Sequence, residues 1–399
     1  MQPLRPSGAR LLTGVLIAGF NLQLGIVAVG PLIDRIRDDT GMSSAVAGLL
    51  ETIPFLCIGC VALSGLGLIS RLGAERLAGY ALVLLCAGTA VRPAMPSPVL
   101  LLAASVPIGI GSGALSLALP ALVKAHYPAS AGAVIGSYAA ALSMGAALAA
   151  FTAVPLANTF GSWRPALAVG AVPAALALPV WIWAARAHLA PLPEAQLGAV
   201  AAMRRPPALG LRLAALFACQ SVTFTVMISW IAALYRHHGW SGSHAGLTTA
   251  TISLVTIPAA LLAGLSDGGD RRPWLVGTGL ALGVGIFGIA LAPTASPWVW
   301  LVIFGVGTGA IYPLCLSLPL DLAAGPHEAA ELTAWMLGAG YFVSAGGPAV
   351  VGGLRDLTGD FRLPMLLLGC IALVAIALGS SGAFRPRPAP VAATGERAG

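Results

Sequence analysis

One stretch of this sequence occurs twice, and the repeat decides the architecture. Gly41-Met42-Ser43-Ser44-Ala45-Val46-Ala47-Gly48-Leu49 returns 198 residues later as Gly239-Trp240-Ser241-Gly242-Ser243-His244-Ala245-Gly246-Leu247, with five of the nine positions identical. Gly161-Ser162-Trp163-Arg164 returns at the same offset as Gly359-Asp360-Phe361-Arg362. A repeat that covers half a chain indicates one duplicated unit and not a solenoid of short repeats.

The composition predicts a membrane protein. Hydrophobic residues make up 58% and charged residues 9% of the 399 residues, whereas an ordinary soluble domain carries roughly 25% charged residues. A helix that spans a bilayer needs about 20 apolar residues. Twelve such stretches are predicted, at 11–33, 44–69, 77–91, 98–123, 131–156, 165–185, 211–234, 244–265, 274–292, 297–320, 331–354 and 363–382. We therefore expect an all-α membrane protein with twelve transmembrane helices in two pseudo-symmetric six-helix bundles.

The repeat also divides the chain into parts. Residues 1–186 and 211–385 are the expected six-helix halves, and the proline-containing segment 187–210 between them is the expected cytoplasmic linker. The proline-rich residues 386–399 are expected to form a disordered cytoplasmic tail. The first span is too long for a cleaved signal peptide, and eleven more spans follow it.

Positive charges predict the orientation. With the N-terminus inside, 14 of the 21 Lys and Arg residues fall on the cytoplasmic side and 7 outside, as the positive-inside rule requires. The chain is thus expected in a bacterial inner membrane with both termini cytoplasmic, and its net charge of +7 needs no nucleic-acid partner. In this assignment Arg92 lies outside, no Lys or Arg lies deep in a span, and the charge run 34–39 is a solvated loop.

No metal site or cofactor is expected. Cys57 and Cys60 form a Cys-x-x-Cys pair, but they lie in an apolar span without a partner pair, which favours simple packing. His237, His238 and His244 gather in one outer loop without a neighbouring carboxylate or Cys, which favours a solvated loop over a metal site.

One acid lies deep in a predicted span. Glu51 is about two turns inside the second span. A carboxylate in hydrocarbon is costly and normally faces a cavity or a partner. Without a nearby cation, burial favours its neutral form, so the group can take up a proton on one side of the membrane and release it on the other. We expect Glu51 to couple transport to protons or to contact the solute; the alternative is a side chain that only packs.

Neutral polar side chains in mid-span are candidate solute contacts. Asn21 and Gln23 in the first span and Gln220 in the matching stretch of the seventh would present amides to one cavity, although hydrogen bonds between helices explain them equally well. Mid-span aromatic residues include Phe224, but tyrosines are preferred because a hydroxyl in lipid lacks a partner. The candidate substrate-binding residues are Asn21, Gln23, Tyr138, Gln220, Tyr312 and Tyr341.

With these features the chain resembles the major facilitator superfamily, whose two six-helix halves surround a central cavity that opens alternately to each side. The segment 70–76 between spans 2 and 3 resembles the superfamily's cytoplasmic loop motif, with Ser70 in place of the usual Asp. Residues 267–272 resemble its copy in the second half. The resemblance implies a cytoplasmic gate formed by Arg71, Arg76, Asp267, Arg271 and Arg272.

Within the superfamily, the chain is similar to the cyanate permease and 2-nitroimidazole porter family. The similarity rests on Asn21-Leu22, on Ala47-Gly48-Leu49-Leu50, on residues 120–124 and on residues 340–364. That family usually reads Asn-Leu-Arg-Pro in helix 1, where the Arg is a natural anchor for an anion. This chain carries Gln23 in its place, and Glu51 replaces the usual Thr. One cation is lost and one anion gained, which favours a neutral or weakly cationic solute.

The sequence therefore predicts a secondary active transporter, and not an enzyme, that moves a small neutral or weakly cationic solute by alternating access. Proton coupling through Glu51 is expected, and export is favoured over import. The alternative is a family-like importer of a small anion such as cyanate. A sensor built on the transporter shell is disfavoured because the loops are short, and an enzyme because no catalytic set of side chains converges. The expected partners are the solute, protons and the lipid bilayer, and the expected state is a monomer.

Overall fold

The computed structural model describes residues 6–127, 130–186, 207–265 and 270–384. Over these residues the chain forms helices and no strands, and twelve helical segments are long and apolar enough to cross a membrane. The predicted all-α class with twelve spans is confirmed. The predicted tail at 386–399 and most of the predicted linker, residues 187–206, lie outside the described residues.

The first half contains spans 1 to 6. Its elements are α1 (Pro6–Asn21), α2 (Leu24–Val27), η1 (Gly30–Leu32), α3 (Ile33–Thr40), α4 (Ser44–Leu72), α5 (Ala74–Val91), η2 (Arg92–Ala94), α6 (Pro98–Ala103), α7 (Ser105–His126), α8 (Ala131–Thr159), α9 (Trp163–Ala168) and α10 (Ala171–Ala185). Several spans are therefore built from two or more helical pieces.

The second half contains spans 7 to 12. Its elements are α11 (Ala208–His237), α12 (Gly242–Gly264), α13 (Arg272–Leu291), α14 (Pro297–Leu322), α15 (Pro326–Ala345), α16 (Gly347–Thr358), α17 (Arg362–Ser380) and η5 (Gly382–Phe384).

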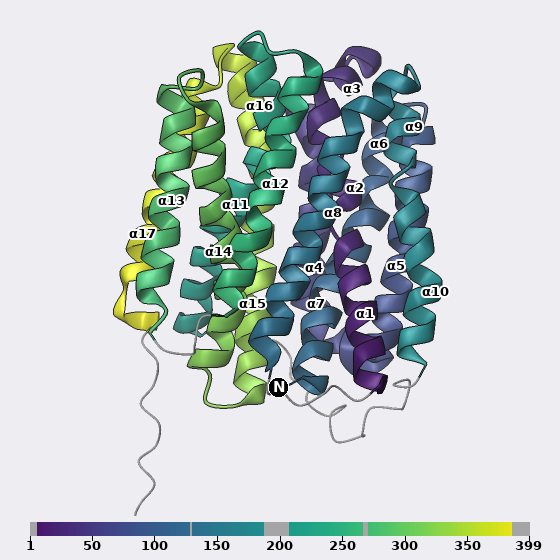
Figure 1. Ribbon diagram of the computed structural model, residues 1–399, viewed down its shortest axis with the longest axis vertical. Helices are drawn as coiled ribbons and strands as arrows, with labels where there is room; N and C mark the ends of the chain where they lie inside the picture. Colours follow the sequence, from purple (N-terminus) through teal and green to yellow (C-terminus); the bar gives the residue numbers. More distant parts are fainter. Residues whose placement is uncertain (1–5, 128–129, 187–206, 266–269, 385–399) are drawn as a thin grey trace, which may run out of the picture.

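The two halves stand side by side, and their helices run roughly parallel to one axis (Figure 1). Helix α1 begins and helix α17 ends at the same end of the bundle, here called the terminal end; α3, α9 and α16 lie at the other, here called the α3 end (Figure 1). Across the interface, α8 packs on α12, and α4 packs on α15 and α16. An ideal Cβ placed on Gly136 would lie 3.2 Å from the Cα of Gly264, so small residues bring these backbones together.

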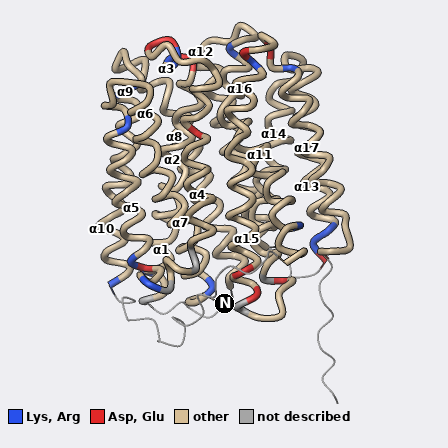
Figure 2. Tube along the Cα trace, turned by 180° about the vertical axis from the view of Figure 1, so that it is seen from behind, with Lys and Arg blue, Asp and Glu red and all other residues tan. Residues whose placement is uncertain are grey.

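Charged residues gather at the two ends of the bundle (Figure 2). This distribution is expected because an unpaired charge in hydrocarbon is costly. Two charged side chains break the pattern by being almost fully buried: Glu51 and Arg92 are each 1% exposed.

The first span is interrupted, although a continuous helix was predicted over 11–33. The helix stops after α1 and resumes as α2 and then η1. Side chains from other helices bond to the backbone carbonyls there: the Ser112 hydroxyl donates to the Leu22 oxygen at 2.8 Å, and Nη2 of Arg92 donates to the Gly25 oxygen at 2.6 Å. Such partners allow a broken helix at membrane depth. Discontinuous helices often form the substrate sites of transporters.

Candidate functional site: a central cavity between the halves

A cavity lies at the interface of the two halves. The break in the first span, α4 and α8 line it from one side, and α11, α12, α14 and α15 from the other. It holds about 440 Å³ of atom-free space, of which about 30 Å³ is open to the centre of a water molecule. One water needs about 10–15 Å³ by that measure, so the cavity is narrow in this conformation. Its lining residues are Gln23, Phe55, Leu142, Ser143, Gln220, Ser221, Phe224, Thr256, Thr308, Gly309, Tyr312 and Tyr341.

Four of the six predicted solute contacts line this cavity. Gln23 reaches it from the break in the first span, Gln220 from α11, and Tyr312 and Tyr341 from α14 and α15. Nε2 of Gln220 makes a long hydrogen bond of 3.5 Å to the hydroxyl of Thr308. Oε1 of Gln23 has no hydrogen-bond partner among the described residues. Buried amides need partners, and a solute in the cavity can supply them.

The other two predicted contacts lie beside the cavity. Tyr138 is 1% exposed, and its side chain meets that of Tyr312. It therefore lies behind a lining residue and does not itself line the cavity. Nδ2 of Asn21 donates to the Ile17 carbonyl of its own helix at 2.9 Å, so its amide nitrogen is bonded within the last turn of α1 in this conformation.

Sequence analysis gave no signal for part of the lining. Serine and threonine are common in membrane helices, where they bond to their own backbone; Thr256, for example, donates to the Ser253 carbonyl at 2.6 Å. A phenylalanine in an apolar span looks the same in the sequence whether it faces lipid or a cavity. The lining residues without a sequence signal are Phe55, Leu142, Ser143, Thr256, Thr308 and Gly309.

Glu51 lies one helical turn before Phe55 on α4, about 6 Å nearer the α3 end. Its Oε2 accepts a hydrogen bond from the hydroxyl of Ser229 on α11, which joins the two halves. Its Oε1 has no hydrogen-bond partner within the described part of the chain. The expectation that Glu51 faces a water-reachable hollow is wrong for this conformation, because the packed interface closes over it.

The expectation that no cation lies deep in the bundle is also wrong. Arg92 was assigned to the outside, yet its side chain is buried in the interior, where it is 1% exposed. The Gly25 carbonyl draws the guanidinium inward, while Nε and Nη1 have no hydrogen-bond partner among the described residues. Counting loop charges places a residue by its nearest helix end, and it cannot detect a carbonyl freed by a broken helix.

Ion pairs between the halves close the α3 end. The carboxylate of Asp34 on α3 binds Arg236 of α11 and Arg355 of α16, each at 3.5 Å. It also binds Arg37 of its own helix at 3.3 Å. The expectation of a solvated loop is therefore wrong for Asp34, whose side chain is 15% exposed and holds two halves together.

The terminal end is open. A second cavity there, here called the vestibule, lies between α4, α7 and α8 of one half and α14 and α15 of the other. About 530 Å³ of it is open to the centre of a water molecule. Much of its wall consists of the alanines Ala121, Ala131, Ala323, Ala324, Ala329, Ala330 and Ala334. The transporter-like shell is thus closed at the α3 end and hollow at the terminal end.

Four of the five predicted gate residues are described, and they lie at this hollow end. Arg71 and Arg76 are exposed. The ion pairs described for Arg271 and Arg272 are made with acids of the second half. Asp267 lies outside the described residues. These contacts within one half are compatible with an open vestibule.

Known proteins match the chain over most of its length. Residues 15–348 match the family model of the Major Facilitator Superfamily. The 2-nitroimidazole transporter of Escherichia coli (strain K12) is 30% identical over 368 residues, which cover 91% of this chain and 93% of that protein. The cyanate transport protein CynX of the same strain is 30% identical over 354 residues, which cover 88% and 92%. The resemblance seen in the sequence is confirmed.

Solved structures share the fold. A D-xylose–proton symporter superposes with a TM-score of 0.72 at 18% identity, covering 95% of this chain and 98% of that one. A bacterial homologue of the human lysosomal transporter Spinster, in an inward-facing and unoccupied conformation, gives 0.73 at 17% identity, covering 97% and 100%. From its family match, its relatives and its twelve spans, the chain belongs to the major facilitator superfamily and is a multi-pass membrane transporter of small solutes, not an enzyme.

Proposed function

We propose that this transporter exports a small, neutral, polar solute across the bacterial inner membrane in exchange for protons, as a monomer that works by alternating access. One observation carries the proposal: the central cavity is lined by amides, hydroxyls and aromatic rings, and none of its twelve described lining residues is charged. Such a site supplies hydrogen bonds and apolar contact without the fixed charge that would anchor an ion. One relative is named for 2-nitroimidazole, a neutral polar ring.

The charges outside the cavity support a neutral solute over a weakly cationic one. Glu51 and Arg92 are both buried in the interior. Whether the carboxyl group is protonated or ionised, the two side chains together carry no net negative charge that would attract a cation. A weakly cationic solute, expected from the sequence, required Glu51 to lie in a bundle without a buried cation, and the buried Arg92 removes that condition.

Glu51 is the proposed proton carrier. Its hydrogen bond to Ser229 joins α4 to α11, so it exists only while the halves are in contact at this level. Separation of the halves at the α3 end would break that bond and expose the carboxyl group to water. A carboxyl group that alternates between a dry and a wet setting can exchange its proton with one side of the membrane at a time.

The orientation follows from the loop charges. If the terminal end faces the cytoplasm, as the excess of Lys and Arg there predicts, the vestibule is the cytoplasmic entrance. We further propose that the gate residues, Arg71, Arg76, Asp267, Arg271 and Arg272, form contacts between the halves when the vestibule closes. The solute would then leave through the α3 end.

The test uses the purified protein in proteoliposomes, with 2-nitroimidazole as the solute and an imposed pH gradient. We expect the gradient to drive 2-nitroimidazole movement against the proton flow. Glu51→Gln should abolish gradient-driven movement but preserve exchange of labelled for unlabelled solute, because exchange needs no net proton transfer. Asp38→Asn, which neutralises an exposed acid at the α3 end, is the matched control. Gradient-driven movement that survives in Glu51→Gln would rule out Glu51 as the carrier.

Arg92 favours a second candidate, the import of a small anion such as cyanate. A buried guanidinium with two nitrogen atoms that lack partners among the described residues can bind an anion, and one relative is named a cyanate transport protein. Uptake of labelled cyanate by the wild type, lost in Arg92→Gln, would support this candidate. It would also contradict the neutral-solute proposal.

A further inference from the structure

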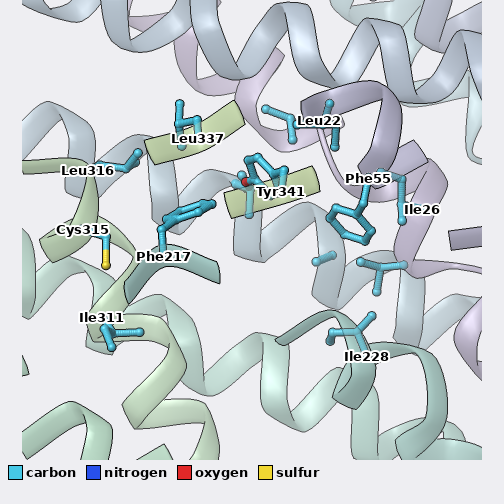
Figure 3. Close-up of a cluster of buried hydrophobic side chains, with 14 of the residues drawn as sticks. Leu22, Ile26, Phe55, Phe217, Ile228, Ile311, Cys315, Leu316, Leu337 and Tyr341 are labelled. Carbon is cyan, nitrogen blue, oxygen red and sulfur yellow. The ribbon is translucent and has the colours of Figure 1, made fainter. Parts of the chain in front are cut away.

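Two aromatic rings from different halves face each other in the central cavity. Phe55 of α4 and Tyr341 of α15 both line it, and their ring centroids lie 6.0 Å apart with 20° between the ring planes (Figure 3). Phe55 is 3% exposed and Tyr341 is 4% exposed. The pair therefore lies at the solute site and at the boundary where the halves move.

The two rings can form the walls of a slot for a third ring. At 6.0 Å between centroids, the rings form an offset pair. A flat ring held between two aromatic faces needs about 7–8 Å, which is twice the carbon–carbon contact distance of about 3.5–4.0 Å. Because the rings are offset, the gap between their planes is smaller than the 6.0 Å between their centroids, so the pair is too close to hold a ring in this narrow conformation. Because the rings belong to different halves, movement of the halves apart opens the slot.

Neighbouring side chains fix the plane of Tyr341. Phe217 of α11 meets it edge to face, with centroids 4.9 Å apart and planes at 80° (Figure 3). The side chain of Tyr312 meets Tyr341 as well. Tyr341 is thus supported from within its own half, and its face toward Phe55 is the one left for a solute.

Glycines hold the two helices in register at this level. Gly59 lies one turn beyond Phe55, and an ideal Cβ there would lie 2.9 Å from the backbone nitrogen of Phe342. An ideal Cβ on Gly338, one turn before Phe342, would lie 2.3 Å from Cδ2 of the Leu63 side chain. Because α4 and α15 touch through these glycines, the rings beside them stay opposite each other.

We propose that the solute is a flat, neutral ring with a polar substituent, held between Phe55 and Tyr341. The amides of Gln23 and Gln220, which line the same cavity from the two halves, bind its polar edge. This inference rests on the neutral-solute function above and narrows it to one shape. Since each half supplies one wall, a bound ring contacts both halves and holds them together. An empty cavity lacks this link between the halves.

The test compares two amides that differ only in the ring. Benzamide is flat, and cyclohexanecarboxamide is its saturated, puckered counterpart; both are neutral. Binding to the purified full-length protein is followed through its melting temperature, which rises with ligand affinity. We expect benzamide to bind about tenfold more tightly, since two aromatic faces contribute to stacking. Phe55→Leu and Tyr341→Leu should bring the affinity ratio close to one, whereas Tyr341→Phe should preserve it.

The ratio is measured within each folded variant, so a general loss of stability does not imitate the effect. Phe151→Leu is the matched control, because Phe151 is 55% exposed on the outside of the bundle and does not line the cavity, and its ratio should equal that of the wild type. Equal binding of the two amides by the wild type would refute the slot and leave the neutral-solute function standing. If cyanate binds and neither the two amides nor 2-nitroimidazole does, both proposals are refuted.

Discussion

Neutralising Asp34 should shift the transporter toward a conformation that is open at the α3 end. The Asp34 carboxylate makes two ion pairs across the halves, to Arg236 and Arg355, with N–O distances of 3.5 Å in both. The side chains involved are 15–36% exposed, so solvent screens the pairs. Each is expected to contribute about 0.5–1 kcal/mol. Asp34→Asn should therefore destabilise the conformation closed at the α3 end by about 1–2 kcal/mol. This changes the ratio of closed to open molecules about 5- to 30-fold.

Spin-label distances across the α3 end measure this equilibrium. Thr159 at the end of α8 and Leu357 near the end of α16 are exposed and belong to different halves. Both would be replaced by cysteine in a background without the six native cysteines. Asp34→Asn should increase the population at long distance. Asp39→Asn is the matched control, because Asp39 makes its described hydrogen bonds within the first half, to Trp163 and Arg164.

Two results would refute this reasoning. The first is a distance distribution in Asp34→Asn that equals that of the wild type. The second is an equal shift in Asp39→Asn, which would show that any loss of charge on α3 has the effect. Raising the ionic strength should reduce the difference between wild type and Asp34→Asn, because salt screens partly exposed pairs.

Two further substitutions test the packing and the inter-half contact. Gly145→Ala should lower the melting temperature, because an ideal Cβ there would lie 1.8 Å from the Phe20 carbonyl oxygen and such overpacking costs about 1–3 kcal/mol of stability. Gly277→Ala is the control and should be neutral or stabilising, since nothing lies within 4 Å of its ideal Cβ. Equal melting temperatures of the two variants would contradict the prediction. Ser229→Ala removes the hydrogen bond to Glu51, which should destabilise the conformation closed at the α3 end by about 1 kcal/mol. The same spin-label pair should then report a larger population at long distance. An unchanged distance distribution would show that this bond does not hold the halves together.

The spans and part of the cavity could be predicted because they depend on local properties. Hydropathy over about 20 residues identifies a spanning helix wherever it packs. The internal repeat adds one long-range fact, since matched positions in two pseudo-symmetric halves face a common axis. Asn21 and Gln220 were matched on this basis; the structure brings Gln220 and the neighbouring Gln23 to one cavity, whereas Asn21 bonds to its own helix.

The buried charges could not be predicted because their positions depend on tertiary structure. Arg92 turns inward toward a carbonyl in the interrupted first span, and no proline stands between α1 and α2, where the helix first stops. Asp34 lies in a mixed charge run that is typical of a loop, and its partners in the second half are about 200 and 320 residues away. Phe55 carries no signal because an apolar span favours phenylalanine on every face.

The alanine wall of the vestibule has a practical consequence for redesign. Methyl groups offer an entering molecule little to bind, so along the alanine part of the wall the width of the mouth limits passage; Ser116, Lys124 and Thr333 are the polar residues of the lining. A bulkier residue at Ala330, which lies in that wall, would act as a sieve that sorts cargo by size. The chemical preferences of the carrier, set deeper inside, would stay as they are.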